Sequence, residues 1–160
     1  MSKIIGITGW KDVGKTYYAS LIIKLLVKKG YQVGSIKHAH HDFDIDKPGT
    51  DSFKHREAGS NQVIVSSSKR WAKITENNNK NEKSLDELIQ ELQHVDIIIV
   101  EGYKKDNHPK IEILGKDLKN RNKETNNVIA IVSDDLKDTI IPVFKKNDIE
   151  NLVEFIVKKI

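Results

Sequence analysis

The sequence predicts an α/β protein with a mainly parallel β-sheet flanked by helices. Short runs of β-branched residues alternate with longer segments of helical periodicity. The run at 95–102 is almost wholly apolar, as a parallel strand covered on both faces requires. A glycine-rich loop also joins the first expected strand to the first expected helix. Together these observations predict one domain over residues 1–160.

The first three elements form a strand–helix–strand unit. Residues 3–8 are a short β-branched run, and an amphipathic helix follows that ends in Lys28 and Lys29. Gly30 stands where a helix cap belongs, and residues 31–37 form the second strand. A strand–helix–strand connection of this length favours parallel pairing of the two strands.

The remaining elements follow from capping residues and short apolar runs. Pro109 comes just before a short alternating run at 110–114, which predicts an edge strand. Peripheral β excursions are expected at about 60–83 and 104–127. The other expected elements are, in order, a helix capped by Asp51 or Ser52, strands at 62–66 and 71–75, a helix capped by Ser84, strands at 95–102, 128–132 and 139–144, and a helix capped by Asp148.

The composition excludes several classes of protein. The 160 residues contain no cysteine, which excludes a disulfide scaffold, cysteine-ligated metal and thiol catalysis. No apolar run reaches the roughly 18–20 residues of a membrane-spanning helix. The net charge of +4 is scattered over short clusters, so it favours anionic ligands only weakly. We expect a cytoplasmic protein that acts on neither membrane nor nucleic acid.

A phosphate-binding loop follows the first strand. The sequence there fits glycine, four residues, glycine, lysine and threonine, the pattern of a P-loop. Glycines let successive backbone N–H groups point at phosphate oxygens, and the helix that follows adds its positive end. We expect nucleotide phosphates to bind this loop and the residue after it, which are Gly9, Trp10, Lys11, Asp12, Val13, Gly14, Lys15, Thr16 and Tyr17.

A magnesium ion is expected beside this loop. In P-loop sites the threonine hydroxyl binds Mg²⁺, and an acidic residue stands at the end of a neighbouring strand. Thr16 and Glu101 meet these two requirements, and the N–H of Gly102 is expected to approach the γ-phosphate. Asp96 opens the same strand, so it is expected at the opposite end of the sheet.

The nucleotide base is less well determined by the sequence. A carboxylate can accept both guanine donors together, and Asp134 and Asp135 follow the 128–132 strand where such a group is needed. The Asn-Lys-x-Asp tetrad is absent, and both aspartates also suit a simple turn. Guanine and adenine therefore both remain open on these residues.

A polar segment rich in histidine and aspartate follows the second strand. Lys37 and His38 leave the carboxyl end of that strand, and His40 and His41 come next. These four residues are candidates for contact with nucleotide, Mg²⁺ or a second anionic ligand. A dedicated transition-metal site and an ordinary solvated loop are the alternatives.

The order of these motifs resembles the MobB family of molybdopterin-guanine dinucleotide biosynthesis. The resemblance covers about residues 4–113. It is carried by the phosphate loop, Lys37-His38-Ala39-His40-His41, Phe43 to Ser52, Glu57-Ala58-Gly59, Arg70-Trp71-Ala72, Val100-Glu101-Gly102-Tyr103 and Pro109-Lys110-Ile111-Glu112.

The resemblance implies a GTP-binding homodimer with weak hydrolysis. Such proteins assist a MobA-type guanylyltransferase that joins GMP to molybdopterin, so the chain itself would be at most a slow GTPase. The resemblance further implies a switch-like segment near the γ-phosphate at Pro48-Gly49-Thr50-Asp51. It also implies that Lys69 and Arg70 meet an anionic partner such as the pterin phosphate, where an ordinary hairpin turn is the alternative.

This chain departs from related proteins at one position of the loop, and two other functions stay open on the sequence. Dimerising P-loop proteins often carry a lysine directly after the first glycine, where this chain has Trp10. A small-molecule kinase would use the same loop, but Arg121 is the only arginine of the basic stretch 116–123 that might form a lid. A metallochaperone GTPase would instead carry its metal on the histidine-rich loop.

Overall fold

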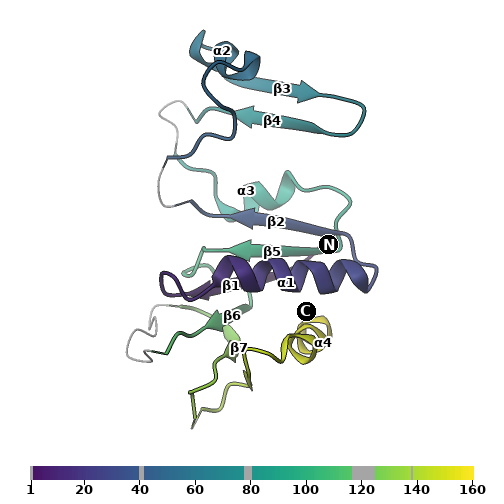
Figure 1. The fold of residues 1–160 in the computed structure, drawn as a ribbon, viewed down its shortest axis with the longest axis vertical. Coiled ribbons are helices and arrows are strands. Elements are labelled where there is room, and N and C mark those ends of the chain that lie inside the picture. Colours follow the sequence, from purple (N-terminus) through teal and green to yellow (C-terminus); the bar gives the residue numbers. More distant parts are fainter. Residues whose placement is uncertain (1, 40–41, 78–80, 117–124, 138) are drawn as a thin grey trace. The chain divides into compact units, whose positions relative to one another are not determined.

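The computed structural model describes residues 2–39, 42–77, 81–116, 125–137 and 139–160 (Figure 1). Strands and helices alternate from β1 to β3, and the strands β5 to β8 follow one another with no helix between them in the described residues. The elements are β1 Lys3–Gly9, α1 Lys15–Lys28, β2 Val33–Lys37, α2 Asp51–Glu57, β3 Gln62–Ser66, β4 Trp71–Thr75, α3 Leu85–Gln90, β5 Ile97–Glu101, β6 Lys110–Ile113, β7 Val128–Val132, β8 Val143–Phe144 and α4 Ile149–Lys159.

The chain divides into two compact units. The first unit holds Met1–His38 and Leu85–Ile160, and the second unit holds Ala39–Ser84. The predicted excursion at 60–83 belongs to the second unit. None of the helices in the described ranges is long and apolar enough to cross a membrane.

A six-stranded sheet forms the centre of the first unit, in the order β2-β5-β1-β6-β7-β8. Every pairing in this sheet is parallel, which confirms the predicted fold class. The expected edge strand at 110–114 is wrong, because β6 lies between β1 and β7. Pro109 precedes the strand and therefore removes no ladder hydrogen bond from it. Of the expected strand 139–144, β8 keeps only Val143–Phe144.

Helices cover both faces of the sheet. Helices α1 and α4 pack on one face, where Ile22 and Leu152 join Ile7 of β1 in the main core (Figure 1). Helix α3 contributes Leu85 to a smaller core on the other face, with Ile98 of β5. The apolar run of β5 thus fills both cores, which explains why its sequence does not alternate.

A buried lysine of β6 holds together the segments that lead into β6 and β7. Lys110 of β6 is fully buried, and its ammonium donates to the carbonyl oxygens of Asp106, His108 (2.9 Å) and Asn126 (3.1 Å). Three donors thus meet three acceptors, which offsets the cost of burying the charge. Burial lowers the pKa of Lys110 below its ordinary value. The alternating pattern of β6 predicts an exposed face, but these backbone carbonyls cover it.

Arg56 links three segments of the second unit. Its guanidinium donates to Asp46 at 2.6 and 3.2 Å, to Asp44 at 2.8 Å and to Glu76 at 2.7 Å. The carboxylates come from the segment before α2 and from the end of the β3–β4 hairpin, which is antiparallel. The Arg56 hydrogen bond lowers the pKa of Asp46 and outweighs the opposing effect of burial.

One helix cap differs from the predicted one, and a second occupies the predicted position. Thr50 precedes α2 and accepts a hydrogen bond from the Phe53 amide at 3.4 Å, so neither Asp51 nor Ser52 is the cap. Asp148 does occupy the cap position of α4, but its carboxylate accepts from the Asn151 side chain at 2.7 Å instead of a backbone amide. Thr50 has the extended backbone that is usual for a capping residue, whereas Asp148 follows a turn.

Candidate nucleotide-binding site

The glycine-rich loop lies between β1 and α1, as predicted. Gly9 has a φ of 149°, and a Cβ placed on it would lie 2.4 Å from the Ile113 carbonyl oxygen of β6. Gly14 precedes the first turn of α1 with a φ of 90°, and Asp12 also has a positive φ of 62°. Positive φ at several positions of one loop curls the backbone so that N–H groups can face a common centre, which suits a phosphate.

The side chain of Lys15 folds back onto this loop and forms a hydrogen bond with it. Its ammonium donates to the carbonyl oxygen of Trp10 at 2.8 Å. A lysine in this arrangement is close to where the phosphate oxygens of a bound nucleotide would lie. The indole of Trp10 and the phenol of Tyr17 flank the site and are 53% and 63% exposed, so both rings are accessible to a ligand or a partner.

Thr16 and Glu101 meet at the same end of the sheet. The Thr16 hydroxyl lies 2.9 Å from one carboxylate oxygen of Glu101 and 3.1 Å from the other. Glu101 ends β5, which runs parallel to β1 with Ile7 opposite Glu101. The carboxyl ends of parallel strands meet at one edge of a sheet, so the two residues approach each other although they are far apart in the chain.

Lys37 completes this group of side chains. It ends β2 directly opposite Glu101 in the parallel pairing. Its ammonium lies 3.2 Å from the Thr16 hydroxyl and 3.3 Å from Glu101 Oε1. Of the three contacts predicted for Lys37, with nucleotide, Mg²⁺ or a second anionic ligand, the strand register favours the one at the expected metal pair.

The Thr16–Glu101 pair fits a magnesium ion. Mg²⁺ is usually held by one or two protein oxygen ligands together with substrate phosphates and water. A hydroxyl and a carboxylate are such ligands, and the ammonium of Lys37 shows that the position already attracts a cation. Within the described residues, no group of three or more His, Cys, Asp and Glu side chains is arranged to hold a metal ion.

The end of β5 packs closely against the end of β2. Gly102 has a φ of 106°, and an added Cβ would lie 2.7 Å from the Cβ of His38. The His38 ring also packs on Tyr103, with ring centroids 4.8 Å apart. The Gly102 N–H donates to the Ile7 carbonyl at 3.4 Å, so contact with a γ-phosphate requires a change of partner.

Asp134 lies just after β7, at the carboxyl edge of the sheet. Its Oδ1 accepts from the Lys146 amide at 3.0 Å, and its Oδ2 lies 3.9 Å from the Lys146 ammonium. Asp135 donates its amide to the Ser133 hydroxyl at 3.2 Å, as in a turn. Asp134 thus retains an acceptor oxygen with only a long ionic contact, whereas Asp135 belongs to the turn.

The remaining candidate residues belong to the second unit or lie outside the described residues. Pro48, Gly49, Thr50 and Asp51 lead into α2 of the second unit. Lys69 and Arg70 occupy the turn of the β3–β4 hairpin, where both amides donate to Ser67 Oγ at 3.3 Å. His40 and His41 are outside the described residues.

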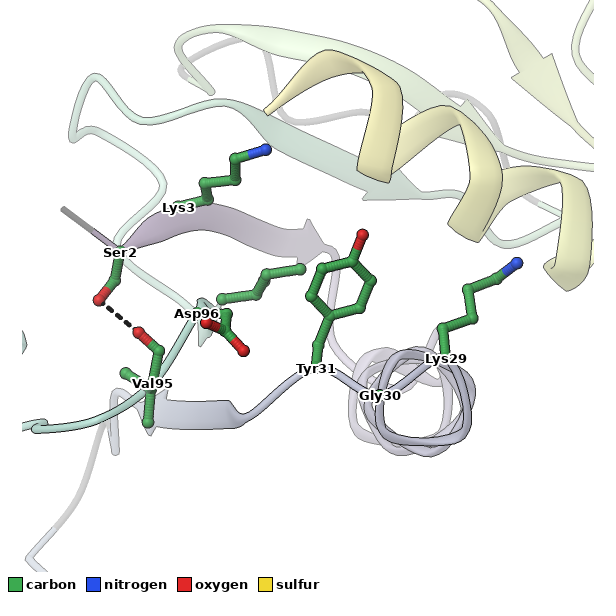
Figure 2. A pocket seen from close by; sticks show the side chains of 8 residues that line it. Ser2, Lys3, Lys29, Gly30, Tyr31, Val95 and Asp96 are labelled. Carbon is green, nitrogen blue, oxygen red and sulfur yellow. Dashed lines mark hydrogen bonds between the residues drawn. The ribbon is translucent and has the colours of Figure 1, made fainter.

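A shallow pocket of about 700 Å³ opens near the start of β1 and β5 (Figure 2). Asp96 lines it, as expected for a residue at the opposite end of β5 from the phosphate loop. The Asp96 carboxylate accepts from the Gln32 amide at 2.8 Å, and Lys29 forms a 3.9 Å ion pair with Glu154. Asp96 and Lys29 therefore each have a partner within the protein.

Comparison with known proteins gives a consistent result. The family model of molybdopterin guanine dinucleotide synthesis protein B (MobB) matches residues 4–134. A molybdopterin-guanine dinucleotide biosynthesis adapter protein of Escherichia coli K12 is 36% identical over 163 residues, which cover 99% of this chain and 93% of the relative. The adapter protein of Haemophilus influenzae is 41% identical over 110 residues, covering 68% and 61% of the two chains.

Solved structures agree in fold. The Bacillus subtilis MobB structure superposes with a TM-score of 0.81 at 23% identity, covering 98% of this chain and 96% of that chain. A second structure of molybdopterin-guanine biosynthesis protein B gives a TM-score of 0.79 at 23% identity, covering 98% and 99%. The matching family model and the full-length relative confirm the resemblance that the motifs indicate: this chain belongs to the MobB family.

Proposed function

We propose that this protein binds Mg²⁺ and GTP at the Gly9–Tyr17 loop and acts as an adapter in the attachment of GMP to molybdopterin. The observation that carries the proposal is the meeting of Thr16 and Glu101 beside the loop, 2.9 Å apart. The names of the relatives support the adapter role. The partner would be a MobA-type guanylyltransferase in the cytoplasm, where GTP and the enzyme meet.

Each part of the site has a defined task in this proposal. The amides of the loop and the Lys15 ammonium bind the phosphates, and Thr16 and Glu101 hold the metal ion, Glu101 through a water. A bound Mg²⁺ neutralises charge on the β- and γ-phosphates. Asp134 is the candidate acceptor for the guanine N–H groups, because it lies beyond β7 with one carboxylate oxygen that has no close hydrogen bond.

Hydrolysis would be slow without a partner. Fast phosphoryl transfer needs a cationic group aimed at the transferring phosphate, often an arginine. The sequence of the first unit contains one arginine, Arg121, which lies outside the described residues. A binding protein that presents or retains GTP is therefore better supported than an efficient GTPase.

We further propose that the second unit forms the homodimer contact. Ile64 and Trp71 lie on one face of the β3–β4 hairpin, because Ser66 pairs with Trp71 and side chains two apart share a face. They are 64% and 69% exposed. Large exposed apolar side chains on a two-stranded sheet are typical of a surface that is covered by another chain.

A reconstituted transferase reaction tests the adapter role. Purified guanylyltransferase, molybdopterin and Mg²⁺·GTP are incubated with and without this protein, and the guanine dinucleotide cofactor formed is quantified. We expect a higher yield with the wild-type protein and no increase with Lys15→Ala. An equal yield in all three reactions contradicts the proposal. Preference for ATP with phosphorylation of an added acceptor would support a kinase instead.

A further inference from the structure

The ammonium of Lys37 lies where the magnesium ion would bind. It is 3.2 Å from the Thr16 hydroxyl and 3.3 Å from the Glu101 carboxylate, the two groups proposed to hold the metal, Glu101 through a water. The parallel pairing of β2 with β5 sets Lys37 opposite Glu101, so both side chains leave the same face of the sheet. Strand register thus places Lys37 within reach of Glu101.

Lys37 and a metal ion would compete for the Thr16 hydroxyl and the Glu101 carboxylate. The Thr16 hydroxyl has one proton, which it donates to Glu101, and it accepts from Lys37 through an oxygen lone pair. A metal on Thr16 needs a lone pair of that oxygen and the negative charge of Glu101. Lys37 already contacts both groups, and its positive charge would repel a divalent cation placed beside it.

The exposure of the two side chains shows which one moves. The Glu101 side chain is 14% exposed, whereas the Lys37 side chain is 61% exposed. A mostly buried carboxylate needs a cationic partner, while an exposed lysine can rotate into water without loss of packing. Displacement of Lys37 by a metal therefore leaves the fold unchanged.

We propose that Lys37 is an internal counter-ion that occupies the cation position when the nucleotide is absent and must leave when Mg²⁺ binds. Lys37 thereby sets the Mg²⁺ concentration at which the site fills. The inference rests on the proposed function only in taking the cation to be the Mg²⁺ that accompanies GTP. It differs from a role of Lys37 as a phosphate ligand, because removal of the side chain would then weaken nucleotide binding.

Metal binding without nucleotide tests the competition. Mn²⁺, a paramagnetic substitute for Mg²⁺, is titrated into the nucleotide-free protein and free Mn²⁺ is measured by electron paramagnetic resonance. An exposed ion pair contributes little, so Lys37→Met should lower the half-saturating Mn²⁺ concentration by only about twofold to tenfold. Lys24→Met removes an exposed lysine from the outer side of α1 and should change nothing, which controls for net charge. Adding Glu101→Gln to Lys37→Met should abolish the gain.

GTP binding with and without Mg²⁺ provides a second test of the competition between Lys37 and the metal. In EDTA, Lys37→Met should bind GTP within about twofold of wild type, and the Mg²⁺ concentration that enhances GTP binding should be lower in the variant. Unchanged or weaker Mn²⁺ binding by Lys37→Met, or a tenfold loss of GTP affinity in EDTA, would overturn the inference. Failure of the wild-type protein to bind GTP would instead contradict the proposed function, while the Mn²⁺ titration would still decide the role of Lys37.

Discussion

The hydroxyl of Thr16 lies 2.9 Å from the carboxylate of Glu101, although the two residues are 85 positions apart in the chain. Three local features produce this contact. The glycine-rich loop starts α1 beside the end of β1, β5 pairs in parallel with β1, and Glu101 is the last residue of β5. The proposed metal site therefore depends on strand register as much as on the loop.

Replacement of Gly102 tests the close approach of β5 to His38. Gly102→Ala places a methyl group 2.7 Å from the His38 Cβ at a φ of 106°. Gly30→Ala is the matched control, because Gly30 has a φ of 94° and nothing within 4 Å of an added Cβ. Backbone strain should lower the free energy of unfolding by roughly 1–2 kcal/mol in both variants, and the clash should add roughly 1–3 kcal/mol for Gly102 alone.

Urea denaturation of both variants measures this difference. Nuclear magnetic resonance shifts of the His38 and Tyr103 rings should move in Gly102→Ala and stay in place in Gly30→Ala, because those rings pack together at the end of β5. Equal destabilisation of the two variants would show that only backbone strain matters at Gly102.

Stability should fall between about pH 6.5 and pH 4 because of His108. Burial, and then the charge of Lys110, lowers the pKa of His108 from 6.5 to about 4. The unfolded state therefore takes up a proton at higher pH than the folded state, so stability is full above the unfolded pKa and declines as the pH falls toward the folded pKa. The expected loss is roughly 1–2 kcal/mol, because the ring is only partly buried.

Denaturation at pH 7 and pH 4.5 measures this effect. His108→Phe keeps a ring of similar shape without a titrating group, and it should lose less stability on acidification than the wild type. His55→Gln, which replaces an exposed histidine of α2, should behave like the wild type. The same acid loss in all three proteins would contradict the assignment.

Arg56 should control the local order of the second unit. Arg56→Ala leaves the carboxylates of Asp44, Asp46 and Glu76 without their shared partner. We expect faster amide hydrogen exchange at residues 43–47 and at the end of β4, because like charges then repel. Lys54→Ala breaks only an exposed pair with Asp51 and should leave the exchange rates unchanged.

The same ion pairs should respond to acid. The hydrogen bond from Arg56 lowers the pKa of Asp46, so this stabilisation is present above the ordinary aspartate pKa and is lost as the pH falls through the lowered value. Exchange that does not respond to Arg56→Ala or to acid would show that other contacts hold these segments.

The proposed dimer contact is tested by the exposed tryptophan of the hairpin. Trp71→Ser should shift the protein toward a monomer in sedimentation equilibrium, because Trp71 is 69% exposed and shares a face with Ile64. Ile140→Ser is the matched control, since Ile140 is fully exposed in the first unit. An unchanged mass for Trp71→Ser, or a wild-type protein that is already monomeric, would contradict the proposed contact.

Local patterns were sufficient to predict the parallel sheet and the positions of the glycine-rich loop and Glu101. The glycine and lysine spacing of the loop is contiguous in the chain, and the apolar run that ends at Glu101 identifies a central strand. Because parallel strands end at one edge, the sequence predicts Glu101 at the same edge as Thr16, and the pairing of β5 with β1 then brings the two residues into contact.

Features that depend on packing were not predictable. The charged residues Lys110 and Glu112 suggest an edge strand, but both are buried, and the cover over Lys110 comes from backbone carbonyls that leave no sequence signal. The position of Lys37 depends on the register of β2 against β5, and a shift of one residue would send its side chain to the other face. Thr50 replaces Asp51 as a cap because both residue types suit that position.

Equilibrium binding of GTP to the Lys15→Ala variant tests the nucleotide site most directly. Calorimetry with Mg²⁺ would compare the wild type, Lys15→Ala and Lys24→Ala, whose lysine lies on the exposed side of α1. We predict binding by the wild type and by Lys24→Ala, and at least a hundredfold loss with Lys15→Ala at a free energy of unfolding within about 0.5 kcal/mol of wild type. GTP binding by Lys15→Ala with wild-type affinity would contradict the assignment of the site.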